Sequence, residues 1–157
     1  MARWSDLERE APEVAAGGRE LFYQHGVGLA YLATARRDDG LRIHPFCPVV
    51  TAGGIFGLIG QSPKRADLAS SGRFAIHAFP REEADDEFML SGMAVRRLDD
   101  PAEIAAVAEV YHAAGATSSG EEWTFEFLLD RALLSLYERR DSGKPLWPPR
   151  YLKWQAR

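Results

Sequence analysis

Short apolar runs separated by polar turns occupy the middle of the chain. Each run is five to eleven residues long and is followed by a polar residue, glycine or proline, a pattern that favours strands over helices. The predicted strands are residues 27–35, 41–50, 55–59, 74–79 and 88–98. Turn signals such as Asp39-Gly40 lie between them and favour antiparallel hairpins.

A helical segment is predicted at the start of the chain, within residues 1–25. Ser5 followed by Glu8 has the spacing of a capping box, so a first helix is predicted to begin there. Pro12 suits the first turn of a second helix. Gly17-Gly18 interrupts the apolar pattern of that second helix and weakens its signal.

A second helical region is predicted over residues 101–114. Asp100 can cap it, Pro101 fits its first turn, and Gly115 is typical of a helix end. Its apolar face is predicted to consist of Ile104, Val107, Val110 and Tyr111.

The last part of the chain is ambiguous between strand and helix. Phe125, Phe127 and Leu129 alternate as in a strand, but Leu133 and Leu136 also fit a helical period. We favour two strand segments bent at Asp130-Arg131, followed by a last strand near residues 151–154. The pattern predicts one α+β, mainly β domain over residues 1–157, a six-stranded antiparallel barrel with a few peripheral helices. Its parts are a helical segment 1–25, a barrel core 26–139 and a tail 140–157.

Two prolines make the run 41–50 unusual for a strand. Pro45 and Pro48 cannot donate ladder hydrogen bonds, so the run is predicted to lie at a sheet edge. Such an edge is either merely irregular or covered by something other than a strand. The second alternative indicates a functional surface.

The sequence Ser62-Pro63-Lys64-Arg65 follows a predicted strand and opens a short helical pattern. Ser62 is a good N-cap, and Pro63 fits the first turn. Backbone N–H groups at a helix start, with two cations beside them, can bind a phosphate or a carboxylate. The alternative is an ordinary capped helix with solvated cations.

Composition narrows the classes of function. The formal net charge of −4 argues against a broad nucleic-acid surface. The single cysteine, Cys47, excludes an internal disulfide and a cysteine-built zinc site, and it is expected to be a small buried side chain. The amino-terminal residues lack the apolar core of a signal peptide, and no apolar stretch is long enough to span a bilayer. A cytoplasmic protein without a membrane partner is expected.

The four histidines share no metal-ligand spacing, and no metal site is predicted. His44 and His77 lie on predicted strands and could meet across the sheet. A hydrogen-bonded structural role is the expectation for each of them.

The chain resembles the pyridoxamine 5′-phosphate oxidase-like family of flavin-binding split β-barrels. The resemblance covers residues 26–98 in order and spacing. It rests on Tyr31 to Thr34, the turn with Gly40, Ile43-His44-Pro45, Ser62-Pro63-Lys64 with Leu68, Arg73 to Phe79, and Gly92 with Ala94.

The resemblance implies a homodimer with two FMN sites at the subunit interface. It places one strand along the isoalloxazine ring (Pro45, Phe46, Cys47 and Pro48) and the end of another near the ring or ribityl chain (Leu58 and Ile59). It implies that Ser62, Lys64 and Arg65 bind the cofactor phosphate. It also implies that Glu87, Ser91 and Met93 of one subunit complete the flavin pocket of the partner subunit. The carboxylate of Glu87 is a poor match beside a flavin.

The resemblance also implies an oxidoreductase in which the flavin transfers hydride or electrons to a small-molecule substrate. The Arg-Leu-His-Asp-Arg motif of true pyridoxamine 5′-phosphate oxidases is absent from residues 144–154, so oxidation of vitamin B6 is not expected. Alternatives on the same fold are a deazaflavin-dependent reductase and a non-catalytic protein that binds flavin or haem. No catalytic side chain is predicted.

Overall fold

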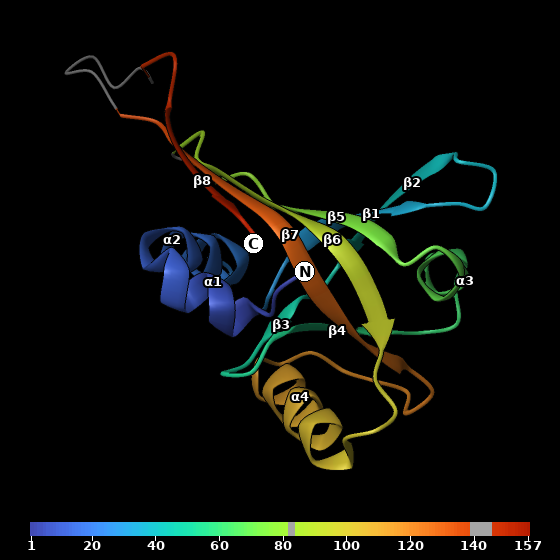
Figure 1. The fold of residues 1–157 in the computed structure, drawn as a ribbon. Helices are drawn as coiled ribbons and strands as arrows, with labels where there is room; N and C mark the ends of the chain where they lie inside the picture. The colour runs from blue at the N-terminus through green and yellow to red at the C-terminus, as the bar shows by residue number, and fades with distance from the viewer. Residues whose placement is uncertain (82–83, 139–145) are drawn as a thin grey trace.

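The computed structural model describes residues 1–81, 84–138 and 146–157 (Figure 1). The helices are α1 (Trp4–Glu10), α2 (Pro12–Tyr23), α3 (Pro63–Ser70) and α4 (Pro101–Ala113). The strands are β1 (Ala30–Ala35), β2 (Leu41–Phe46), β3 (Val49–Val50), β4 (Ile55–Ile59), β5 (Arg73–Ala78), β6 (Glu87–Arg96), β7 (Trp123–Leu136) and β8 (Arg150–Gln155). The boundary expected between residues 139 and 140 lies outside the described residues.

All eight strands belong to one curled antiparallel sheet. Seven follow one path in the order β2-β1-β5-β6-β7-β4-β3, and β8 pairs with β7 beside this path. The prediction of a mainly β α+β chain is confirmed, but the prediction of six strands is wrong. The main reason is that the run 41–50 forms two strands, which lie at opposite ends of the path.

The two prolines explain that division. Pro45 pairs with Tyr31 near the end of β2, and Pro48 then precedes the two-residue strand β3. Because neither residue can donate to a ladder, the chain leaves one edge of the sheet and joins the other between them. The predicted edge position of this run is confirmed.

Strand β7 is continuous through the region that was ambiguous in sequence. Its register with β6 shifts opposite Ser91 and Gly92, where Asp130 is the additional residue of a bulge. A Cβ atom on Gly92 would lie 2.0 Å from the Leu128 carbonyl oxygen, so only glycine fits there. A glycine inside a strand suits such a close approach of two backbones. The predicted bend at Asp130-Arg131 is a bulge within one strand.

The first helix begins two residues earlier than the predicted cap at Ser5 indicated. Its N-cap is Arg3, whose backbone N–H donates to the Asp6 carboxylate at 2.9 Å, so Ser5 and Glu8 do not form the capping box. Helix α2 is unbroken at Gly17-Gly18. A Cβ atom on Gly18 would overlap the Phe88 ring at 2.2 Å, so this glycine brings the helix close to the sheet.

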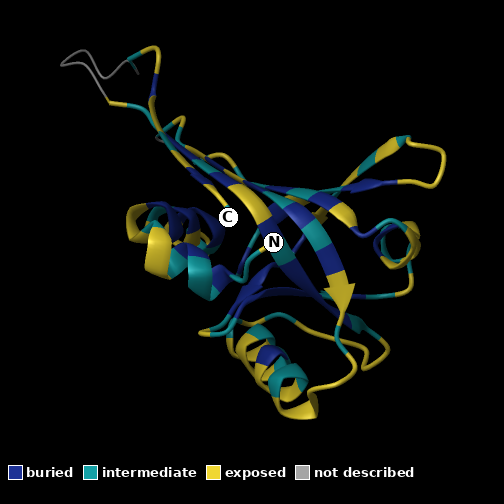
Figure 2. Ribbon diagram, in the orientation of Figure 1, coloured by how far each residue is buried: buried dark blue, intermediate teal, exposed yellow. Residues whose placement is uncertain are grey.

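The main core lies between the inner face of the sheet and helices α1 and α2 (Figure 2). Trp4, Phe22 and Phe88 are fully buried there, and Phe22 meets Phe88 edge to face at 5.2 Å between ring centroids. Both helices lie on the same side of the sheet (Figure 1). The outer face of β1, β5 and β6 carries no helix among the described residues.

Helix α4 covers the other end of the sheet. It buries only Val107, which packs with Val49 and Phe56 in a small second core, and Tyr111 lies at the edge of that core. The predicted apolar face is therefore wrong in part, because Val110 is exposed.

A network of two acids and two arginines connects the chain start to α4. The Glu126 carboxylate, 1% exposed, lies 2.5 Å from Arg3 Nε and 3.1 Å from Arg97 Nη1. The same two arginines contact Glu103 at 2.6 and 3.2 Å. Glu126 is thus a buried charge compensated from both sides.

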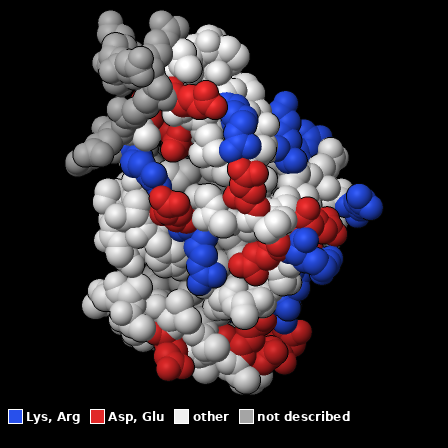
Figure 3. All heavy atoms as spheres, turned by 90° about the vertical axis from the view of Figure 1, so that its left-hand side faces the viewer, with Lys and Arg blue, Asp and Glu red and all other residues white. Residues whose placement is uncertain are grey.

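The charged side chains show no concentration of one sign on the face of Figure 3, where basic and acidic groups alternate. Oppositely charged side chains also form exposed pairs, among them Arg150–Glu13 and Arg81–Glu20, both at 2.7 Å. Among the described residues, no helix has the length and apolarity required to cross a bilayer.

Candidate functional site

The start of α3 has the predicted cap. Ser62 is the N-cap, its Oγ accepts a hydrogen bond from the Arg65 backbone N–H at 3.4 Å, and Pro63 begins the helix. The same Oγ donates to the Gly60 carbonyl oxygen at 3.0 Å. The cap fixes the turn that presents Lys64 and Arg65 at the end of β4.

A buried carboxylate attaches α3 to the sheet. Asp67, 8% exposed, accepts hydrogen bonds from Thr34 Oγ1 on β1 and Arg42 Nε on β2, both at 2.9 Å. These two bonds hold α3 across the β1–β2 edge. By fixing α3 against β2, Asp67 also fixes the position of Lys64 relative to Pro45.

Lys64 points to the proline-containing edge. Its Nζ donates to the Pro45 carbonyl oxygen at 3.3 Å, and it forms no ion pair among the described residues. Partial burial lowers the pKa of the Lys64 ammonium, and the nearby Cys47 opposes this shift. A partly buried cation without an acidic partner stabilises an anion that binds beside it.

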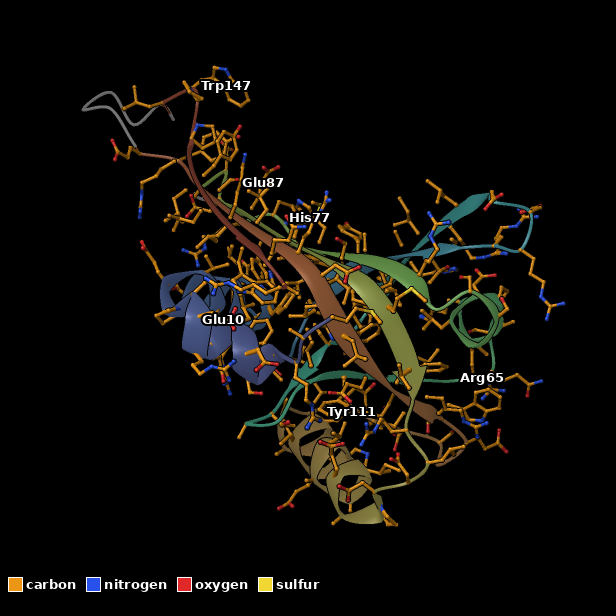
Figure 4. All side chains as sticks on the ribbon, viewed as in Figure 1. Glu10, Arg65, His77, Glu87, Tyr111 and Trp147 are labelled. Carbon is orange, nitrogen blue, oxygen red and sulfur yellow. The ribbon has the colours of Figure 1, made fainter. Side chains whose placement is uncertain are left out.

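Cys47 is close enough to Lys64 for their charges to interact, and Tyr111 is likewise close to Cys47. Burial raises the pKa of the Cys47 thiol, and Lys64 partly offsets the rise. Burial also raises the pKa of the Tyr111 hydroxyl, with a smaller contribution from Cys47. Both groups are therefore neutral near pH 7, and Lys64 is the charged member of the cluster. Figure 4 shows Tyr111 on the side of α4 that faces the sheet.

His44 precedes Pro45 on β2, close enough to Lys64 for the lysine charge to act on it. Its Nε2 atom is buried and has no hydrogen-bond partner among the described residues, so the expected hydrogen-bonded structural role is wrong for this nitrogen. Burial lowers the pKa of His44, and the Lys64 and Arg42 charges lower it further. His77 does not meet it, because β1 lies between the two strands that carry them. His44 is thus a neutral, unsatisfied polar group beside Lys64.

Arg65 leaves α3 in another direction. Its Nη1 donates to the Glu121 carbonyl oxygen at 3.1 Å, and its guanidinium lies 4.6 Å from the Trp123 ring centroid. Arg96 stacks on the same indole at 3.4 Å. A cavity of about 540 Å³ adjoins this cluster, lined by Gln61, Ser62, Pro63, Arg65, Ala66, Ala69 and Trp123. Lys64 and Arg65 therefore face different sides of the helix start.

The other predicted cofactor-binding residues near α3 differ in exposure. Phe46 and Ile59 point into the core at 7% and 1% exposure, and Pro48 is also buried. Any contact between these three and a cofactor would come from backbone atoms. Leu58 is partly buried beside the small core under α4.

The side chains of Glu87, Ser91 and Met93 all lie on the outer face of β6. Figure 4 shows Glu87 and His77 on the side of the sheet opposite helices α1 and α2, and their side chains approach to 3.9 Å. Strand β6 lies three strand spacings from β2, roughly 14 Å, with β1 and β5 between them. Among the described residues no hydrogen bond or ion pair joins Lys64 to any of these three, and β6 meets the chain just after α3, where the Ala94 N–H donates to the Gly72 carbonyl oxygen at 2.7 Å.

Three residues of the site were absent from the sequence-based set: His44, Tyr111 and Trp123. His44 stands next to Pro45 in the quoted resemblance, which was a usable signal. Trp123 comes from β7 and meets Arg65 of α3, and Tyr111 comes from α4 and lies near Cys47. Only the tertiary packing brings them there.

No protein-family model matches this chain, and the search of curated proteins found no match. Solved structures do resemble it. A heme binding protein from Mycobacterium smegmatis is similar with a TM-score of 0.64 at 14% identity, over 89% of this chain and 57% of that one. The chain thus spans a little over half the length of that protein.

For two further structures, the similarity extends over most of the length of the compared protein. HutZ, the heme storage protein from Vibrio cholerae, has a TM-score of 0.58 at 16% identity, over 76% of this chain and 89% of that one. A Clostridium acetobutylicum protein related to general stress protein 26 of B. subtilis, described as of the pyridoxinephosphate oxidase family, has a TM-score of 0.58 at 11% identity. This similarity extends over 96% of this chain and 95% of the Clostridium protein.

These likenesses show the fold. The chain has the split β-barrel fold of the pyridoxamine 5′-phosphate oxidase-like proteins, as the sequence resemblance implied.

Proposed function

We propose that this protein is a flavin-binding oxidoreductase in which the phosphate of FMN lies at the start of α3, beside Lys64. The proposal rests on the surroundings of Lys64. It is a partly buried cation at a capped helix start, with a backbone carbonyl as its hydrogen-bond acceptor and without an acidic partner among the described residues. A phosphate would supply the missing counter-charge.

The ring would extend along the edge formed by Pro45 and Cys47. A flat cofactor can cover an edge whose prolines cannot pair with another strand. The unsatisfied Nε2 of His44, the residue before Pro45 on β2, offers a hydrogen-bonding group near this edge. When bound, FMN supplies the hydride or electron transfer, and the residues of the chain position it and exclude water.

The proposal includes a homodimer. The outer sheet face places Tyr31, His77, Met89 and Leu133 side by side on four successive strands of the path, β1, β5, β6 and β7. Tyr31 and Met89 are 40% and 38% exposed there. A second copy covering this face would bury these side chains and bring Glu87, Ser91 and Met93 of one subunit toward Lys64 of the other.

A titration identifies the cofactor. Purified protein is mixed with FMN, with a deazaflavin coenzyme and with haemin in turn, and affinity is measured by flavin fluorescence and by absorption. The proposal predicts that FMN binds most tightly. Tighter binding of deazaflavin would make the protein a deazaflavin-dependent reductase, the first alternative on this fold.

Haem binding is a second candidate, and one contact favours it. His77 Nδ1 lies 2.7 Å from the Ala78 carbonyl oxygen, an arrangement that leaves Nε2 as the ligating nitrogen. Two similar structures are described as heme binding and heme storage proteins. Haemin that gives a sharp Soret band with native protein and with His25→Ala, but not with His77→Ala, would support this candidate. Equal spectra in all three would exclude ligation by His77.

A further inference from the structure

A cavity of about 560 Å³ opens on the outer face where β6, β7 and β8 lie side by side. It is separate from the α3 site of the same chain. The lining residues are Met89, Ser91, Arg131, Ala132, Leu133, Lys153, Trp154 and Gln155.

The strand register brings two cations together at this cavity. Arg131 pairs with Gln155, and Leu133 pairs with Lys153, so Arg131 and Lys153 are diagonal neighbours on adjacent strands. Diagonal neighbours in an antiparallel pair are about 7 Å apart, and the long side chains of arginine and lysine can converge from there on one carboxylate or phosphate group. Ser91 lies directly opposite Arg131 on β6 and adds a hydroxyl group.

No acid neutralises these cations among the described residues. Neither Arg131 nor Lys153 forms an ion pair there, whereas Arg150 on the same strand β8 pairs with Glu13 at 2.7 Å. Asp130, the nearest acid in sequence, does not line the cavity. Two like charges on adjacent strands repel one another, and an anion between them removes that repulsion.

The rest of the lining is largely apolar. Met89 and Leu133 occupy the row next to Ser91 and Arg131, and Trp154 contributes to the wall. A small inorganic anion would leave this part of the cavity unused. A ligand with an anionic end and an apolar body matches both parts.

We propose that this cavity binds a small organic anion, with Arg131 and Lys153 holding its carboxylate or phosphate and Met89 and Leu133 contacting its apolar body. Ser91 belongs both to this cavity and to the residues that one subunit would contribute to the flavin pocket of its partner. The bound anion would therefore be the substrate of that pocket, an assignment that rests on the proposed function.

Naphthoate and its neutral amide, naphthamide, are suitable probes, since they differ mainly in charge. Both are titrated into ¹⁵N-labelled full-length protein and followed by NMR. The variants are Arg131→Gln/Lys153→Gln and, as a matched control, Arg37→Gln, which removes a positive charge from the exposed β1–β2 turn.

Naphthoate is expected to shift amide signals of residues 89–91, 131–133 and 153–155. Its affinity should fall about tenfold or more in the double variant and stay unchanged in Arg37→Gln. Equal affinity for naphthamide, equal affinity in the double variant, or shifts elsewhere on the protein would each overturn the proposal.

FMN uptake is measured on the same samples to separate this proposal from the proposed function. Loss of naphthoate binding with normal FMN uptake in the double variant supports the anion site. Naphthoate binding without any FMN uptake would retain the anion site and overturn its assignment as a substrate site for a flavin.

Discussion

Lys64 Nζ donates a hydrogen bond to the Pro45 carbonyl oxygen at 3.3 Å and thereby joins the start of α3 to the proline-containing edge strand β2. Both residues were singled out in the sequence for separate reasons, a capped helix start and a strand that cannot complete its ladder. The fold places them in contact. The proposed flavin site is built on this contact, with phosphate at one side and a flat ring at the other.

The buried carboxylate of Glu126 should dominate the stability of the region between the chain start and α4. Glu126→Ala leaves Arg3 and Arg97 without this partner, and we expect a loss of about 3 kcal/mol in the free energy of unfolding. Urea denaturation measures it. Glu20→Ala, which removes an exposed pair with Arg81, should change stability by about 0.5 kcal/mol or less. Equal effects would show that the buried network contributes no more than a surface pair.

Gly92 should not tolerate a side chain. In Gly92→Ala the new methyl group would overlap the Leu128 carbonyl oxygen, and the bulge would have to move at a cost of about 2 kcal/mol or more. Thermal and urea unfolding measure the change. Gly60→Ala is the control, since its Cβ atom would meet nothing within 4 Å. A Gly92→Ala protein as stable as the control would refute the close approach.

Cys47 should be alkylated slowly at neutral pH. Because burial raises the thiol pKa, the thiolate fraction is reduced, and the iodoacetamide rate should rise at higher pH than for a free thiol with a pKa of about 8.5. Lys64→Met removes the cation that opposes this rise, so its pH–rate curve should move further upward. A curve at or below that of a free thiol, or a downward movement in Lys64→Met, would contradict the assigned surroundings.

The proposed dimer predicts a specific effect of charge on the outer sheet face. Met89→Glu introduces an acid that meets its own copy or an apolar surface in a symmetric interface, so the protein should become monomeric. Sedimentation velocity measures the change. Val110→Glu, on the exposed side of α4, should leave the dimer intact. A native monomer at all concentrations would refute the dimer.

The local elements were predictable where a short sequence determines the geometry. Ser62 and Pro63 define the start of α3, and Gly92 marks the close approach of two strands, because each effect depends on a few neighbouring atoms. The resemblance also led to the correct fold.

The parts that failed depend on distant residues. The run 41–50 divides into β2 and β3 because β3 pairs with β4 and β2 pairs with β1, a choice that the run itself does not contain. Gly18 is compatible with a helix because Phe88 packs against it, and β6 lies far away in the sequence. The site was incomplete for the same reason, since Trp123 reaches Arg65 of α3, and Tyr111 comes near Cys47, only through tertiary packing.

The comparison of FMN with riboflavin tests the central claim most directly. The two ligands differ by the phosphate, so their affinities for the native protein and for Lys64→Ala isolate the contact in question. We predict that Lys64→Ala weakens FMN binding about ten- to a hundredfold and changes riboflavin binding about twofold or less, with Arg37→Ala unchanged for both. Equal losses for FMN and riboflavin in Lys64→Ala, or no binding of either ligand to the native protein, would contradict it.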